Sequence, residues 1–230
     1  MKTIGLIGGM SWESSLEYYR LINEGIKAKL GGLHSAKCIM LSVDFAEVEE
    51  LQRSGKWEES GRMMAQAAAS LQAGGADCIV LCTNTMHIAA DAIQQAVSVP
   101  FLHIADAAAE AVLAAGIRKV GLLGTRFTME KEFYRDRLGR KFGLEVVIPA
   151  EEDRGIVHRV IYDELVLGII REESLREYVR IIEAMRQQGA QGVILGCTEI
   201  GLLVHPEDSP LPLFDTTSIH AAAAVEFAVH

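Results

Sequence analysis

The sequence predicts an α/β protein made of two pseudo-symmetric domains, each with an open parallel β-sheet. Short apolar runs alternate with helical patterns along the chain. The runs are rich in Val, Ile and Leu and do not alternate with polar residues, as expected for strands covered on both faces. Motifs of the first half also recur in the same order in the second half, which indicates a duplicated unit.

The repeat rests on five pairs of segments that keep nearly one offset. The pairs are residues 5–8 and 121–124, 18–20 and 133–135, 75–81 and 189–195, 82–83 and 197–198, and 99–102 and 211–214. Chance likeness between buried strands would explain the apolar runs. It does not explain why a Tyr-Arg and a Cys-Thr dipeptide both recur, the latter after one inserted glycine, Gly196.

Each half is expected to contain four strands with helices between them. The predicted strands are residues 3–8, 36–43, 77–82, 99–104, 119–124, 144–149, 192–197 and 211–214, and the helical patterns include 14–30, 57–73, 129–141 and 173–188. Ser14 and Glu17 predict a capping box, and Gly31 with Gly32 ends that first helix. Strands that alternate with helices imply right-handed βαβ units.

The domain bounds follow from the repeat and from the last helical pattern. Residues 1–105 together with 216–230 are expected to form the first domain, and residues 106–215 the second. The linker is placed near 104–108, and the final helix, 216–229, is expected to pack back on the first half.

Charge and hydropathy exclude two classes of partner. The formal net charge is -9, so a nucleic-acid site is not expected, because phosphate binding needs a basic face. No stretch approaches the roughly 20 apolar residues that span a bilayer. The apolar N-terminus breaks at Gly8 and Gly9 and is followed by Glu13, which favours a first strand over an export signal. No membrane partner and a cytoplasmic location are therefore expected.

The four cysteines fit neither a zinc nor a thioredoxin-type spacing. Cys38 and Cys78 lie within predicted strands and are interpreted as core residues. Cys82 and Cys197 instead end matching strands of the two halves. Either Cys-Thr pair alone would be read as core, but the mirrored pair favours function.

Ligands of open parallel sheets bind beyond the carboxyl ends of the strands. Three loops are expected there, namely residues 8–11, 82–85 and 196–199. Their N–H groups suit a carboxylate, although Gly8-Gly9 alone also fits a simple tight turn. Hydroxyls of Thr83, Thr85 and Thr198 are candidates to bond a sulfur or a substrate carboxylate. His87 is interpreted as a helix-cap or supporting residue rather than a metal ligand.

Two thiols suit the inversion of a stereocentre, because one proton must leave one face while another arrives at the opposite face. If the two sheets face one cleft, Cys82 and Cys197 approach it from opposite sides. A helix N-terminus lowers the pKa of a cysteine, so a thiolate is expected.

Three motifs resemble those of the aspartate/glutamate racemase family, above all its bacterial aspartate and broad-specificity amino-acid racemases. They are Gly8-Gly9-Met10-Ser11-Trp12, Cys82-Thr83-Asn84-Thr85-Met86-His87 and Gly196-Cys197-Thr198-Glu199-Ile200, and the resemblance covers nearly the whole chain. It implies a two-domain α/β fold with the active site in the cleft between the domains. It also implies a homodimer that acts on a small amino acid without pyridoxal phosphate, metal or any other cofactor.

The same resemblance implies roles for individual residues. Cys82 and Cys197 would be the catalytic pair that takes the α-proton from opposite faces. The expected substrate-binding residues are Met10, Ser11, Gln52, Thr83, Asn84, Thr85, Thr198 and Glu199. Gln52 would lie near the substrate side chain, Asn84 and the threonines at the α-carboxylate, and Glu199 at the α-ammonium.

One departure bears on the substrate. Some aspartate-specific relatives use a lysine after the Ile-Tyr of the second domain to hold the distal carboxylate. Here Ile161-Tyr162 is followed by Asp163 and Glu164, which favours less selectivity for acidic side chains.

Other functions stay open at this level. Related cysteine enzymes are alternatives: a hydantoin racemase, a maleate cis–trans isomerase with one nucleophilic cysteine, or a decarboxylase, which the presence of both cysteines disfavours. A non-catalytic small-ligand binder is a further alternative, since two α/β halves with a cleft are also a binding-protein plan.

Overall fold

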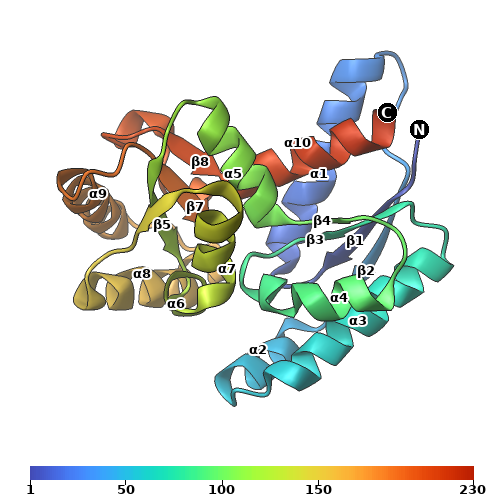
Figure 1. Cartoon of the computed structure of the whole chain (residues 1–230), viewed down its shortest axis with the longest axis horizontal. Helices are drawn as coiled ribbons and strands as arrows, with labels where there is room; N and C mark the ends of the chain where they lie inside the picture. Colours follow the sequence, from blue (N-terminus) through green and yellow to red (C-terminus); the bar gives the residue numbers. More distant parts are fainter. The chain divides into compact units, whose positions relative to one another are not determined.

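Two four-stranded parallel sheets organise the chain in the computed structural model, which describes residues 1–230 (Figure 1). The first sheet has the order β2-β1-β3-β4 and the second the order β6-β5-β7-β8. The strands are β1 (Ile4–Gly8), β2 (Cys38–Ser42), β3 (Cys78–Leu81), β4 (Phe101–Leu102), β5 (Lys119–Gly124), β6 (Glu145–Val147), β7 (Val193–Gly196) and β8 (Leu213–Asp215). All eight predicted strands are present, and the predicted α/β class with two equivalent sheets is confirmed.

Helices cover both faces of each sheet. The α-helices are α1 (Trp12–Leu30), α2 (Phe45–Arg53), α3 (Trp57–Ala73), α4 (Ala90–Ala96), α5 (Ile104–Ala114), α6 (Arg126–Glu130), α7 (Glu132–Asp136), α8 (Glu151–Asp163), α9 (Glu172–Gln187) and α10 (Thr216–Val229). Short helical turns are η1 (Thr85–Ala89), η2 (Arg137–Lys141), η3 (Leu165–Leu167), η4 (Ile200–Leu202) and η5 (Pro206–Asp208). None of the helices combines the length and the apolarity that crossing a membrane requires.

The chain forms two compact units, each built around one sheet. Residues 1–104 and 220–230 form the first unit, and residues 105–219 form the second. The chain therefore passes between units at Ile104–Ala105 and returns at Ile219–His220. The first crossing lies in the first turn of α5, so the predicted linker is helical. Both termini belong to the first unit, where the Lys2 N–H donates to the carbonyl oxygen of Ala228 at 2.9 Å.

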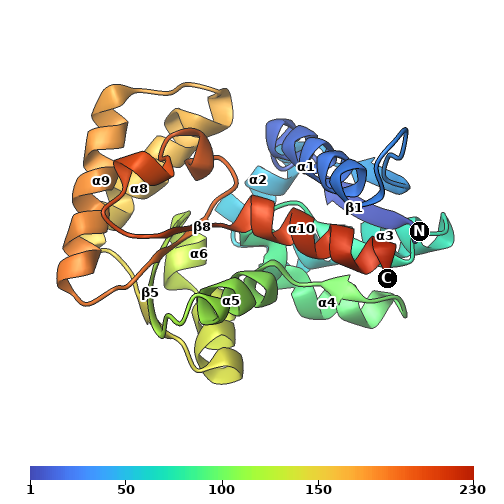
Figure 2. The ribbon, with the colours of Figure 1, turned by 90° about the horizontal axis from the view of Figure 1, so that it is seen from above.

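The first sheet separates two apolar layers. On one face, Ile4 and Leu6 of β1 pack with Tyr18 of α1 and with the alanine-rich side of α10. On the other face, Ile7 packs with residues of α3 and α4, such as Met64. The final helix therefore packs on the first half, as predicted. Figure 2 shows α1 and α10 running beside each other in this unit.

The second sheet is covered in the same manner. Val193 and Leu195 of β7 pack with α8 and α9, including the fully buried Tyr178. Leu122 and Ile194 point to the opposite face and are also fully buried. In Figure 2 the strands of this unit lie between α8 and α9 on one side and α5 on the other.

One predicted helix is interrupted in the structure. The pattern over residues 129–141 is divided into α6, α7 and η2, because Lys131 is extended with ψ of 149°. The helix also starts earlier, since the side chain of Thr125 caps α6 by accepting from the Thr128 N–H. Arg135 then donates to the carbonyl oxygen of Glu130 at 2.9 Å, which stabilises the break.

Candidate active site

The loop after β3 begins with Cys82 at the carboxyl edge of the first sheet. The Cys82 N–H donates to the carbonyl oxygen of Ile7, at the end of the neighbouring strand β1, at 2.9 Å. The hydroxyl of Ser14, in the first turn of α1, donates to the Cys82 carbonyl at 3.1 Å. The backbone on both sides of the thiol is thus held by β1 and α1.

The loop after β1 carries Met10 and Ser11, both buried. Gly9 has φ of +95°, and a Cβ there would lie 2.2 Å from the Val43 carbonyl oxygen, so only glycine fits. The Gly9 N–H donates to the Ser15 hydroxyl at 2.7 Å. This N–H therefore already has a hydrogen-bond partner within the protein and does not point at an anion.

The capping box predicted from Ser14 and Glu17 is wrong. Ser11 caps α1, and its hydroxyl accepts from the Ser14 N–H at 3.3 Å. The helix starts earlier than the sequence pattern suggested. Ser14 is thereby free to bond the Cys82 backbone, and Gly31 ends the helix as predicted.

Thr83, Asn84 and Thr85 continue the Cys82 loop, and all three are buried. The Thr83 carbonyl accepts a hydrogen bond from Nδ1 of His87 at 2.7 Å. The Asn84 carbonyl accepts from the His87 N–H at 3.1 Å. His87 thus bonds only backbone groups in these contacts, which agrees with the supporting role predicted from the sequence.

Gln52 lies on the buried face of α2, one turn after Val48. Its neighbour Arg53 is exposed and forms ion pairs with Glu49 and Glu50. Of the two polar residues at this end of α2, the structure therefore directs Gln52 inward and Arg53 to solvent.

The carboxyl edge of the second sheet depends on two glycines. Gly124 at the end of β5 pairs with Gly196 at the end of β7. A Cβ on Gly196 would lie 2.8 Å from the carbonyl oxygen of Leu123, and one on Gly124 would lie 2.7 Å from that of Gly196. The inserted glycine of the second repeat thus allows the two strand ends to approach closely just before Cys197.

Cys197, Thr198 and Glu199 converge on one carboxylate oxygen. The Cys197 thiol donates to Oε2 of Glu199 at 3.0 Å, and the Thr198 hydroxyl donates to the same oxygen at 2.7 Å. Cys197 and Glu199 are buried, with 8% and 4% of their surfaces exposed. This unit therefore holds a thiol, a hydroxyl and a carboxylate in direct contact.

The surroundings of both thiols raise their pKa values, whereas the helix N-termini expected from the sequence would have lowered them. Burial raises the pKa of Cys82 and the pKa of Cys197, and the charge and hydrogen bond of Glu199 raise that of Cys197 further. The expectation assumed a helix N-terminus beside each sulfur. The loops instead lead into the short turns η1 and η4, which each start three residues after the cysteine and carry little dipole.

Further polar residues at the same edge of the second sheet were not singled out in the sequence. Thr125 follows β5 directly and is buried. Thr216 and Thr217 follow β8 and are buried too, and the Thr216 hydroxyl donates to the Leu195 carbonyl at 2.7 Å. The repeat could have identified Thr125. It aligns Gly121–Gly124 with the segment that precedes Gly9, so Thr125 stands where Gly9 stands in the first half.

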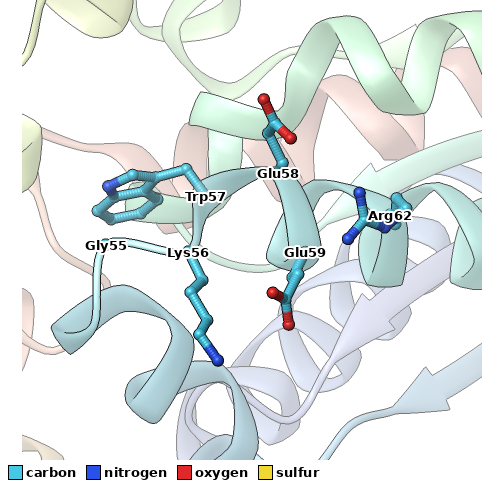
Figure 3. A pocket seen from close by; sticks show the side chains of 6 residues that line it. All are labelled: Gly55, Lys56, Trp57, Glu58, Glu59 and Arg62. Carbon is cyan, nitrogen blue, oxygen red and sulfur yellow. The ribbon is translucent and has the colours of Figure 1, made fainter.

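Two surface hollows each lie within one unit and contain neither Cys82 nor Cys197. The first, of roughly 440 Å³, is lined by Gly55, Lys56, Trp57, Glu58, Glu59 and Arg62. Figure 3 shows these side chains around the start of α3. The second lies among α8, η3 and α9 and includes Glu164 and Ser174. Neither hollow belongs to the cysteine loops.

Two α/β units of the same strand order, each with a buried thiol just beyond a central strand, define the class of protein. The model of the Asp/Glu/hydantoin racemase family matches residues 7–224, and the chain belongs to this family. Its activity is therefore that of a racemase, an isomerase.

Known proteins of similar sequence or structure agree with this family. A crystal structure from Yersinia pestis, provisionally named an Asp/Glu racemase, is 56% identical with a TM-score of 0.94, and 100% of each chain is covered. An aspartate racemase homologue from Pyrococcus horikoshii OT3 is 37% identical with a TM-score of 0.86, again over 100% of both chains. The broad specificity amino-acid racemase RacX of Bacillus subtilis is 25% identical over 171 residues, 73% of this chain and 72% of the relative.

Proposed function

We propose that this chain racemises amino acids by two-base proton transfer, with Cys82 and Cys197 acting on opposite faces of the α-carbon. One observation carries the proposal. Each thiol directly follows the strand that occupies the third place in its sheet, β3 in the order β2-β1-β3-β4 and β7 in the order β6-β5-β7-β8. The repeat therefore places a thiol just beyond corresponding strands of the two sheets, which supports a paired acid/base role.

The mechanism needs one thiolate and one thiol at the start of each turnover. The thiolate takes the α-proton, and the electron pair of the broken C–H bond moves towards the α-carboxylate. The second thiol then donates its proton to the opposite face, and becomes the thiolate for the reverse reaction. Protons and charge balance without pyridoxal phosphate, metal or redox partner, so we propose that none is used.

The remaining residues are proposed to bind the substrate. Glu199 would pair with the α-ammonium, since it is a buried carboxylate in contact with the Cys197 thiol. Asn84 with the hydroxyls of Thr83, Thr85 and Thr198 would hold the α-carboxylate and stabilise the charge that develops there. Met10, Ser11 and Gln52 would complete the surroundings of the substrate, with Gln52 towards its side chain.

We propose aspartate- and glutamate-like amino acids as the substrate class, with breadth towards other side chains. The family description and the names of the relatives support the class, and RacX is named as broad in specificity. Asp163 and Glu164 support the breadth, because they follow Tyr162 where some aspartate-specific relatives have a lysine.

Cysteine-to-serine substitutions test the mechanism. Cys82→Ser and Cys197→Ser should each lower racemisation by about 10²–10⁴-fold, the usual contribution of a positioned acid or base. The readout is α-proton exchange in heavy water, followed by NMR across the proteinogenic amino acids. Cys38→Ser is the matched control, since Cys38 is half-buried in β2 and should leave the rate unchanged.

The alternatives give different results in the same assay. Full activity of either active-site variant would contradict the two-base mechanism. A covalent cysteine adduct seen by mass spectrometry would favour a nucleophilic isomerase, and exchange only with hydantoins would favour a hydantoin racemase. Binding of amino acids without any proton exchange would favour a ligand-binding protein.

We also propose that the chain forms a homodimer through α1. Trp12, Leu16 and Tyr19 recur at helical spacing and are 64%, 59% and 49% exposed, which forms an apolar stripe on one side of the helix. Leu16→Glu should convert a dimer into a monomer in sedimentation equilibrium. A wild-type chain that is monomeric at micromolar concentration would contradict this proposal.

A further inference from the structure

His87 joins the Cys82 loop to the segment where the chain leaves the first unit. Its Nδ1 lies 2.7 Å from the Thr83 carbonyl oxygen, and its Nε2 lies 3.2 Å from the backbone nitrogen of Ile104. A carbonyl only accepts and a backbone N–H only donates, so Nδ1 carries the proton and Nε2 accepts. The ring is therefore held as one neutral tautomer.

A second buried histidine anchors the return crossing in the same region of the first unit. His220 donates from Nε2 to the Leu102 carbonyl at 2.8 Å and accepts at Nδ1 from the Tyr18 hydroxyl at 2.9 Å. The ring centroids of His87 and His220 are 5.9 Å apart. Both crossing segments, at Ile104 and at His220, are thus tied to the first unit by histidines that lie next to each other.

The backbone around Cys82 has several anchors, and the one from His87 reaches a crossing segment. Ile7 and Ser14 bond the Cys82 peptide groups, and Leu81 bonds the Thr83 N–H. The Thr83 carbonyl is left for His87. At the matching position of the second unit, five residues after Cys197, the chain has Leu202, which is 50% exposed. The Cys82 loop therefore has a support that the Cys197 loop lacks.

We propose that His87 is a positioning residue, which sets the orientation of Cys82 by holding the Thr83 carbonyl against the crossing segment at Ile104. The inference rests on the proposed function of Cys82 in proton transfer. His87 itself touches no reacting atom in this proposal. His87 acts by fixing the peptide group that follows Cys82, so that the thiol keeps its orientation during turnover.

Two substitutions separate the two hydrogen bonds of the ring. His87→Asn keeps a donor near the place of Nδ1 and loses the group that accepts from Ile104. His87→Gln keeps a polar group near the place of Nε2 and loses the donor to Thr83. We expect His87→Gln to lower kcat for α-proton exchange by about 10–100-fold, as misplacement by about 1 Å does, with KM changed less than about twofold. His87→Asn should lose less of kcat than His87→Gln, because it keeps the bond to Thr83 and loses only the anchor at Ile104.

A second readout does not depend on activity. The rate of iodoacetamide labelling of Cys82, measured by mass spectrometry, should rise several-fold in His87→Gln because the loop loses its anchor. Cys78 is the internal control, since it is fully buried four residues earlier in β3 and should label as in the wild type. Tyr18→Phe removes the bond to His220 and leaves both His87 bonds, so it should change neither kcat nor the labelling of Cys82.

The outcomes distinguish this inference from the proposed function. Equal losses of kcat in both His87 variants and in Tyr18→Phe, with faster labelling of Cys78, would show a general packing role and overturn the inference. A wild-type protein that exchanges no α-proton would instead overturn the proposed function, while the labelling of Cys82 in His87→Gln would still decide whether His87 fixes the loop.

Discussion

The two cysteine loops follow equivalent strands, yet they surround their sulfur atoms differently. Cys82 packs among apolar residues such as Leu6 and Tyr18, and burial alone raises its pKa. Cys197 donates to the carboxylate of Glu199, whose charge raises its pKa beyond the effect of burial. The comparison teaches that a repeated fold supplies equivalent positions, while local residues decide how readily each thiol loses its proton.

Among changes that test the difference between the two loops, the largest effect is expected from removing the carboxylate of the second loop. Glu199→Gln should lower the pKa of the Cys197 thiol, since a neutral amide no longer repels the thiolate. The proposed loss of the ammonium partner should raise KM by about 10–100-fold, the range of a hydrogen bond to a charged group. The pH dependence of Cys197 alkylation gives the pKa, and steady-state kinetics give KM.

The control for this experiment is Glu207→Gln, because Glu207 lies exposed in η5 and should change neither quantity. An unchanged Cys197 pKa in Glu199→Gln would contradict the inference that Glu199 makes the two loops electrostatically different.

Acid should destabilise the first unit through His220. Burial lowers the pKa of His220 from 6.5 to about 4. Between these values the unfolded chain binds the proton and the folded chain does not, so stability is present above pH 6.5 and falls as the pH falls towards 4. The loss should be about 2 kcal/mol between pH 7 and pH 5, at up to 1.4 kcal/mol per pH unit.

Urea unfolding at several pH values measures this slope. His220→Gln keeps a donor for the Leu102 carbonyl but does not titrate, so its stability should fall less steeply over the same range. Parallel curves for the variant and the wild type would assign the acid sensitivity to other groups.

A smaller effect is expected from the glycine that precedes Cys197. Gly196→Ala places a Cβ 2.8 Å from the Leu123 carbonyl oxygen, so β5 and β7 must move apart. We expect a loss of about 1–3 kcal/mol in the free energy of unfolding, as overpacking usually costs. The first unit lacks this inserted glycine, because Leu81, which matches Leu195, precedes Cys82 directly, so the requirement is specific to the second loop.

The control for Gly196→Ala is the substitution with the smallest expected effect, Gly61→Ala. Gly61→Ala lies within α3, where the new Cβ would be 3.7 Å from the Ala92 Cβ, an ordinary contact. It should stabilise the protein by about 0.5–1 kcal/mol, because alanine loses less backbone entropy in a helix. A loss of stability in Gly61→Ala as large as that in Gly196→Ala would mean that the strand ends have no special requirement for glycine.

The sequence alone determined the strands, the α/β class and the repeat, because buried parallel strands leave continuous apolar runs that need no knowledge of distant residues. It also placed both cysteines at the ends of matching strands, whereas in the structure each directly follows its strand. The exact ends of the helices were harder to predict from the sequence. Ser11 rather than Ser14 caps α1, and Thr125 starts α6 three residues before the predicted helix. Capping depends on which hydroxyl meets a free N–H, and neighbouring serines or threonines look alike in sequence.

Only the tertiary structure decided the chemistry around the sulfur atoms. A lowered cysteine pKa was expected from a helix N-terminus, but burial raises the pKa of both thiols. The bonds from Ser14 and His87 to the Cys82 loop likewise join residues that local patterns cannot relate. Protonation depends on solvent access and on charges brought close by folding, and such quantities exist only once the chain has packed.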